Sequence, residues 1–204
     1  MTVCRTDRGH EGATLARRLQ TRLEGFYRLE ALPDVDDFAE PTDEEGREVV
    51  LVRQAPDAVE VSVTLPAAGL VPPSGDLSLD VLCQIVEGVS HFVYLADRIR
   101  SLRSTTRLEL ELQAEVDKFV VLGFAAVSRA DHGTAWRVVH RLYEGVRFLH
   151  PAGSEEGDRY RVANDLAARF CARVARRVGS DARERLVRFH REGQEEKMRL
   201  ARAA

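Results

Sequence analysis

Three pairs of side chains that can transfer protons or hold a metal ion are spaced four residues apart in the middle of the chain. The pairs are Glu87 with His91, Glu111 with Glu115, and His140 with Glu144. Because residues i and i+4 project from the same face of a helix, each pair would present two such groups together. Carboxylates and imidazoles on facing helices build the metal sites of helical bundles, most often as Glu-x-x-His. The spacing of four departs from that motif, so the pattern alone does not establish a site.

The place of each pair on its helix indicates whether it is buried. In the helix predicted for residues 77–102, Glu87 and His91 fall opposite the apolar stripe, and the third pair likewise opposes the stripe of its own helix. Only Glu115 lies beside apolar neighbours, which makes it the leading candidate for a catalytic or metal-binding group. The sequence therefore favours exposed ion pairs for two of the three pairs. A metal or acid–base site requires the polar faces of these helices to converge, which the sequence leaves open.

Sequence motifs for the common enzyme classes are absent. The chain has no GxxxxGK[ST] or GxGxxG loop, no HExxH or GxSxG motif and no EF-hand loop, so no cofactor is indicated by motif. The cysteines Cys4, Cys83 and Cys171 are odd in number and form no CxxC pair. They therefore predict neither a zinc knuckle nor a disulfide framework.

Two further segments could bind anions. The stretch 150–161, followed by Asn164, leads into a predicted helix whose amino terminus could hold a phosphate. Its first turn, however, contains Glu155, Glu156 and Asp158, which favour an ordinary capped helix. The segment 169–191 is rich in arginine and could contact nucleic acid, but acidic residues alternate with the arginines and the pI is about 6.1.

A bias in amino-acid composition explains the abundance of arginine, so no function is needed to account for it. Only Lys118 and Lys197 among the 30 basic residues are lysine, and Asn164 is the only asparagine. This bias is typical of a GC-rich, bacterial genome, which supplies arginine without selection for phosphate binding. Nucleic-acid binding is therefore the third of our functional expectations.

Hydropathy patterns predict a mainly helical α+β protein that forms a single domain over residues 1–204. An alternation of apolar and polar residues after a Pro-Asp turn predicts one β-hairpin in the N-terminal half, with strands at 48–52 and 59–65. Helical periodicity predicts about six helices. They span 10–31, 77–102, 107–128, 134–149, 155–178 and a last segment from 181 onward. Gly179 is expected to end the fifth of them in the left-handed conformation.

Other segments are predicted to be irregular. We expect a flexible N-terminus at 1–9, an acidic loop at 33–46, a Pro/Gly loop at 66–75 and a frayed, charged end at 192–204. For 105–112 two structures remain open. The sequence from Thr106 to Glu109 matches a helix capping box, whereas the alternation from Leu108 to Leu112 suits a strand.

These features lead to ranked expectations for function. The chain lacks an apolar run of roughly 18 residues and a signal peptide, so we expect a cytoplasmic protein away from membranes. The first expectation is a non-enzymatic adaptor or regulatory domain whose helices 10–31 and 181–200 bind a protein partner or a second copy. Deleting 192–204 should then weaken association but leave the fold intact. The alternative is a metal- or carboxylate-dependent enzyme that uses the three Glu/His pairs.

Overall fold

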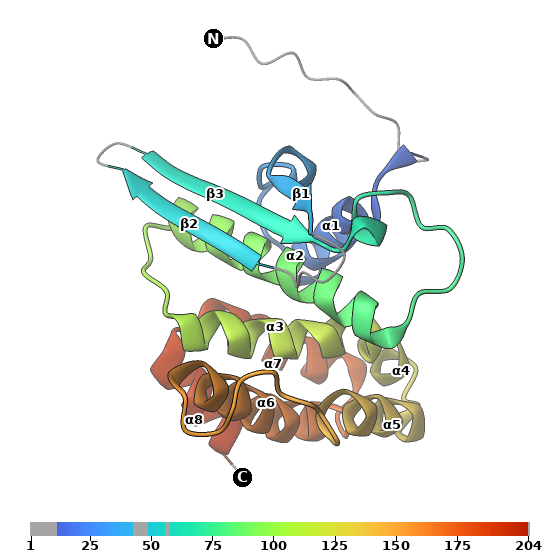
Figure 1. Ribbon diagram of the computed structural model, residues 1–204. Coiled ribbons are helices and arrows are strands. Elements are labelled where there is room, and N and C mark those ends of the chain that lie inside the picture. Colours follow the sequence, from blue (N-terminus) through green and yellow to red (C-terminus); the bar gives the residue numbers. More distant parts are fainter. Residues whose placement is uncertain (1–11, 43–48, 56–57, 204) are drawn as a thin grey trace.

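The computed structural model describes residues 12–42, 49–55 and 58–203, and in this part of the chain eight α-helices accompany a small sheet (Figure 1). The helices are α1 (Leu15–Tyr27), α2 (Leu79–Arg100), α3 (Arg107–Leu122), α4 (Phe124–Ser128), α5 (His132–Tyr143), α6 (Glu155–Val174), α7 (Gly179–Arg191) and α8 (Gln194–Arg202). The mainly helical α+β class is therefore confirmed, although the sequence predicted about six helices. The predicted flexible segment 1–9 lies outside the described residues.

The sheet contains the predicted hairpin and one further strand. β2 (Val49–Ala55) and β3 (Ala58–Leu65) pair antiparallel, with Val52 opposite Val61. β1 (Ala39–Pro41) adds to the other edge of β3 in parallel, which gives the order β1-β3-β2. The sheet packs against α2, and Val63 and Leu65 are fully buried.

Part of the predicted acidic loop at 33–46 is ordered. A 3-10 helix, η2 (Val35–Asp37), precedes β1, and the Val35 side chain is fully buried. The Thr14 hydroxyl at the start of α1 donates a 2.7 Å hydrogen bond to Asp36, which ties the segment to the first helix. Gln20 of α1 also accepts a 2.8 Å hydrogen bond from the Val35 N–H, so the segment is held against α1; residues 43–46 lie outside the described part. A second 3-10 helix, η3 (Ala67–Gly69), lies within the predicted loop at 66–75.

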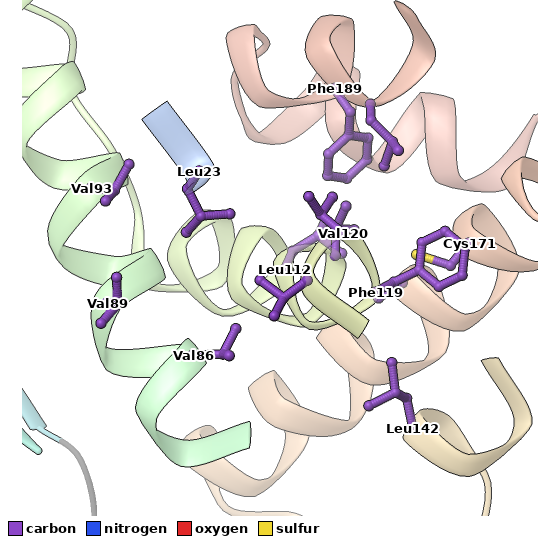
Figure 2. Close-up of a cluster of buried hydrophobic side chains, with 14 of the residues drawn as sticks. Leu23, Val86, Val89, Val93, Leu112, Phe119, Val120, Leu142, Cys171 and Phe189 are labelled. Atoms are coloured by element: carbon purple, nitrogen blue, oxygen red, sulfur yellow. The ribbon is translucent and has the colours of Figure 1, made fainter. Parts of the chain in front are cut away.

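The centre of the molecule is formed by α2 and α3. α2 packs against the sheet and α1 as well as against α3, and α3 in turn packs against α6 (Figure 1). Figure 2 shows the apolar side chains that these helices bring together, with Val89 of α2, Leu112 and Phe119 of α3 and Phe189 of α7 among them. α2 is thus covered on several sides, which decides the environment of its polar residues.

By length and composition alone, α2 is apolar enough to cross a membrane. Half of that apolar window is buried within this chain, and a single helix of this kind is weak evidence for a membrane span. The helix was not expected to meet this criterion, because its charged residues interrupt the apolar run.

Local signals for the starts of helices are confirmed. The hydroxyls of Ser78, Thr106 and Ser154 each accept a hydrogen bond from the backbone N–H three residues ahead. Residues 107–112 are therefore helical, and the alternative of a strand is wrong. The reciprocal half of the capping box is absent, because the Glu109 carboxylate instead pairs with Arg98.

Three predicted helix ends are wrong. The helix expected over 134–149 ends at Tyr143, and residues 144–149 are not helical. The helix expected over 107–128 is divided at Gly123 into α3 and α4; a Cβ atom there would lie 2.6 Å from the Phe119 ring. α6 ends at Val174, and Gly179 is the first residue of α7 rather than a left-handed stop. The positive φ angles occur elsewhere, for example at Gly145 in the segment between α5 and α6.

The C-terminal segment is part of the core, contrary to the expectation that 192–204 frays. Lys197 and Ala201 on α8 are fully buried, and α8 packs against α6. The Arg173 guanidinium donates hydrogen bonds of 2.8 and 2.7 Å to the carbonyls of Leu200 and Ala201 and so caps the end of α8. The charged composition suggested fraying. The residues that bury this helix lie far away in the sequence, so composition alone could not reveal them.

Candidate metal centre and adjoining pocket

Glu87 and His91 of α2 meet Glu111 of α3. One ligand atom from each side chain lies within 4.8 Å of the other two, and His91 Nε2 is 3.5 Å from Glu111 Oε2. The three side chains retain only 10–12% of their exposed surface. The expectation that Glu87 and His91 face solvent is therefore wrong. The side of α2 that carries Glu87 and His91 is covered by α3, whose Lys118 and Glu111 contact them.

Two cations are paired with these carboxylates. Lys118 Nζ lies 2.7 Å from Glu87 Oε2 and 2.8 Å from Glu115 Oε1, and Arg159 Nε of α6 lies 3.7 Å from Glu111 Oε1. Burial alone would lower the pKa of Lys118, but the charges of Glu115 and Glu87 raise it well above its ordinary value. Three carboxyl groups thus share two cationic side chains, so acidic groups outnumber basic groups in this cluster.

Glu115 lies one turn beyond Glu111, outside the group of three. Burial raises the pKa of its carboxyl group above the ordinary value; Lys118 opposes this shift and the charge of Glu87 adds to it. A buried carboxyl group with a raised pKa is suited to accept and return a proton. The predicted partial burial of Glu115 agrees with the structure, where 16% of the side chain is exposed.

A cavity of about 690 Å³ adjoins this cluster and lies between α2, α3 and the segment that joins α5 to α6. Its size falls within the range of small-molecule sites. Its polar wall includes Cys83, Glu87, Glu115, Lys118 and Asn164, and its apolar wall includes Leu79, Leu142, Val146, Phe148, Leu149 and Tyr160. Because Glu87 belongs both to this wall and to the Glu87–His91–Glu111 group, a molecule in the pocket would lie next to that group.

The remaining predicted pair stands apart. His140 Nε2 and Glu144 Oε2 are 2.7 Å apart on the surface of α5, and 62% of each side chain is exposed. The pair neither lines the pocket nor belongs to the group of three. Of the six predicted site residues, the structure therefore brings four to one place, with three of them as a group, and leaves this pair as a solvent-exposed ion pair.

The other predicted anion sites have local structural partners. Ser154 already accepts the Gly157 N–H at the start of α6, and the Asp158 carboxylate accepts the Gly153 N–H. Among the arginines of the C-terminal helices, Arg183 donates to the carbonyls of Gly25 and Phe26 at the end of α1. Arg183 therefore holds the end of α1, and others of these arginines pair with acidic side chains, as Arg185 does with Asp181.

The sequence analysis missed the two lysines. Both are buried, Lys118 beside the acidic cluster and Lys197 within a second polar network in the core. In that network, the Lys197 ammonium group donates a hydrogen bond to the side-chain oxygen of Gln113. The Asp117 carboxylate accepts hydrogen bonds from Gln113, Ser90 and Tyr27. A signal existed, because a chain that otherwise uses arginine throughout has lysine at only these two positions.

Comparison with protein-family models, curated proteins and solved structures finds no match for this chain. The functional argument therefore starts from the geometry of Glu87, His91 and Glu111 and of the pocket beside them. Two helices supply all three side chains, so their relative position is fixed by the packing of α2 on α3.

Proposed function

We propose that this protein is a metal-dependent enzyme that binds a divalent cation through Glu87, His91 and Glu111 and acts on a small molecule in the adjoining pocket. The observation that supports this proposal most directly is the convergence of the three ligand atoms within 4.8 Å at the edge of a cavity. Buried groups with shifted pKa values beside a pocket are typical of active sites.

The chemistry of the three side chains suits a transition metal or zinc. One imidazole nitrogen and two carboxylate oxygens are ligands for Zn²⁺, Mn²⁺ and Fe²⁺, which bind such atoms at about 2.0–2.2 Å. Small side-chain rotations would bring the three atoms around one ion. Three protein ligands leave at least one coordination position for water or for a ligand, as in catalytic rather than structural sites.

Other residues would assist the reaction from the pocket wall. Glu115 is the proposed acid–base group, because its carboxyl group is buried and borders the cavity. Lys118 and Arg159 hold the carboxylates of Glu87 and Glu111 in place before the ion binds. A metal ion that coordinates the Glu87 carboxylate would leave Lys118 paired with Glu115 alone.

The expectation of a protein-interaction domain has less support. The helices on which we expected a partner to bind, α1, α7 and α8, use their apolar faces inside this chain; Leu23, Leu186 and Ala201, for example, are fully buried. Binding of a protein partner or of nucleic acid stays a prediction, and no contact in the described part of the chain favours it over the enzyme proposal.

The test is metal binding by the full chain. After treatment with a chelator and dialysis, isothermal titration with Zn²⁺ and Mn²⁺ and elemental analysis should show about one ion per chain. The variants Glu111→Gln and His91→Ala should bind the ion at least tenfold more weakly. The matched control is the variant His140→Ala with Glu144→Gln, which removes an exposed His/Glu pair of the same spacing and should bind normally.

Circular dichroism would establish that the variants are folded. If folded Glu111→Gln protein bound the ion as tightly as the wild type, or if the wild type bound none, the proposed function would be wrong.

A further inference from the structure

We infer that the pocket accepts an organic anion with an aromatic or other apolar body. This inference rests on the proposed function, because the bound cation would neutralise the negative charge at the inner end of the pocket. It goes beyond that proposal by naming the chemical class of the ligand. The observations that support it are the apolar wall and the charges at the edge of the cavity.

The apolar wall is contributed mainly by the segment between α5 and α6. Val146 and Leu149 line the cavity, yet 40% and 62% of their surfaces are exposed. Large apolar side chains that remain exposed around a cavity are typical of ligand sites. Phe148 and Tyr160 add aromatic surface to the same wall.

This wall is held in place by Arg161 of α6. Its guanidinium group donates hydrogen bonds of 3.0 and 2.8 Å to the carbonyls of His150 and Gly157 and lies 4.6 Å from the centre of the Phe148 ring. The pocket is therefore shaped before a ligand binds, which reduces the entropy lost on binding.

Two exposed arginines, Arg141 and Arg147, line the pocket as well. Within the described residues no carboxylate forms an ion pair with either of them, whereas another basic group of the lining, His150, is paired with Glu156 at 3.2 Å. One exposed acid of the lining, Asp80, is hydrogen-bonded at 2.8 Å to the neutral Gln84 side chain and so keeps its negative charge, but the two arginines outnumber it. The two arginines therefore supply the unneutralised positive charge at the pocket edge, and guanidinium groups bind carboxylates and phosphates in bidentate fashion.

The inner end of the pocket has the opposite charge until the metal ion binds. Glu87 and Glu115 share one cation there, Lys118. A divalent ion bound to Glu87, His91 and Glu111 would neutralise Glu87 and leave the cluster with a net positive charge. An anionic group could then approach the ion, so binding of the anion should depend on the metal.

The test uses an aromatic anion, 8-anilinonaphthalene-1-sulfonate, whose fluorescence rises when it enters an apolar site. With the full chain saturated with Zn²⁺, we expect the sulfonate to bind at one site per chain. Its affinity should be at least fivefold lower in the double variant Arg141→Ala with Arg147→Ala. It should also fall when a chelator removes the Zn²⁺. The neutral compound N-phenyl-1-naphthylamine has the same aromatic body without the sulfonate and should bind the variant and the wild type alike. Arg129→Ala, which removes an exposed arginine outside the pocket, is the control.

Calorimetric titration with Zn²⁺ on the same samples separates the two proposals. Suppose that Zn²⁺ binds, but the arginine variant binds the sulfonate as tightly as the wild type does, or its affinity falls equally for the sulfonate and for the neutral compound. The anion inference is then wrong and the proposed function stands. If Zn²⁺ does not bind, the proposed function is wrong. In that case, sulfonate binding that still requires the two arginines would support an anion pocket without a metal, and its absence would overturn the inference too.

Discussion

Lys118 Nζ on α3 lies 2.7 Å from Glu87 Oε2 on α2, so a carboxylate that we assign to the metal ion already holds a buried cation. The same ammonium group is bound by Glu115. A divalent ion must therefore compete with Lys118 for Glu87, and the strength of this ion pair sets the affinity of the site for metal.

Replacing this lysine by methionine should tighten metal binding. Lys118→Met keeps the unbranched apolar part of the side chain but removes the competing positive charge, so the affinity for Zn²⁺ should rise at least tenfold in calorimetric titration. The metal-free variant should also unfold at a lower urea concentration, because three buried carboxylates would then share only Arg159, and Zn²⁺ should restore part of the lost stability.

The other buried lysine provides the control for this experiment. Lys197→Met changes a residue of the same type and burial outside the metal group, and it should leave the affinity for Zn²⁺ unchanged. Folded Lys118→Met protein that binds the ion no more tightly than the wild type would show that Glu87 is not a ligand.

Lys197 should make the stability depend on pH. Burial lowers its pKa from the usual 10.5 to about 7, although the charges of Glu109 and Asp117 favour the protonated form. Between about pH 7 and 10 the unfolded chain therefore binds a proton that the folded chain does not, and stability rises with pH in this range. Arg98 opposes protonation, and Gln113, Tyr94 and Phe189 surround the ammonium group.

The measurement is urea unfolding of wild type and Lys197→Met at pH 7 and pH 9. The variant cannot gain or lose this proton, so its stability relative to the wild type should fall by about 2 kcal/mol between the two pH values. An equal pH dependence of both proteins would mean that Lys197 keeps its proton in the folded state.

Removal of α8 should destabilise the whole fold. Deleting residues 192–204 takes Lys197 and Ala201 out of the core. It also removes the donor to the Gln113 side-chain oxygen and the two carbonyls that the Arg173 guanidinium binds. Loss of buried apolar contacts and of buried hydrogen-bond partners predicts a decrease of about 3–5 kcal/mol in the free energy of unfolding, measured by thermal or urea unfolding. The control deletes only residues 203 and 204. A shortened chain with unchanged stability would restore the expectation that this segment frays.

Signals confined to a few residues were readable from the sequence, and signals that depend on distant contacts were not. The Ser78 hydroxyl accepts a hydrogen bond from a backbone N–H only three residues ahead, so its capping role could be predicted from spacing alone. The burial of His91 required knowledge that α3 covers the side of α2 that carries it, which a helical wheel for one helix cannot give. Lys197 likewise depends on Gln113, 84 residues earlier, so composition alone suggested a solvated helix.

Gly157, at the start of α6, should be essential for the shape of the pocket wall. A Cβ atom at this position would lie 2.0 Å from the carbonyl oxygen of Pro151 and 2.8 Å from Ser154 Oγ, so the backbone before α6 would have to move. Gly157→Ala should therefore lower the free energy of unfolding by about 2–3 kcal/mol, as other overpacked sites do.

The displacement should also weaken binding of 8-anilinonaphthalene-1-sulfonate, because the same backbone leads into the wall that contains Phe148 and Leu149. Gly133→Ala is the matched control near the start of α5, where the nearest atoms to a new Cβ lie 3.7 Å away. It should retain probe binding and gain up to about 1 kcal/mol from the better helix propensity of alanine. If Gly157→Ala matched this control in both stability and probe binding, the contact with Pro151 would not position the wall.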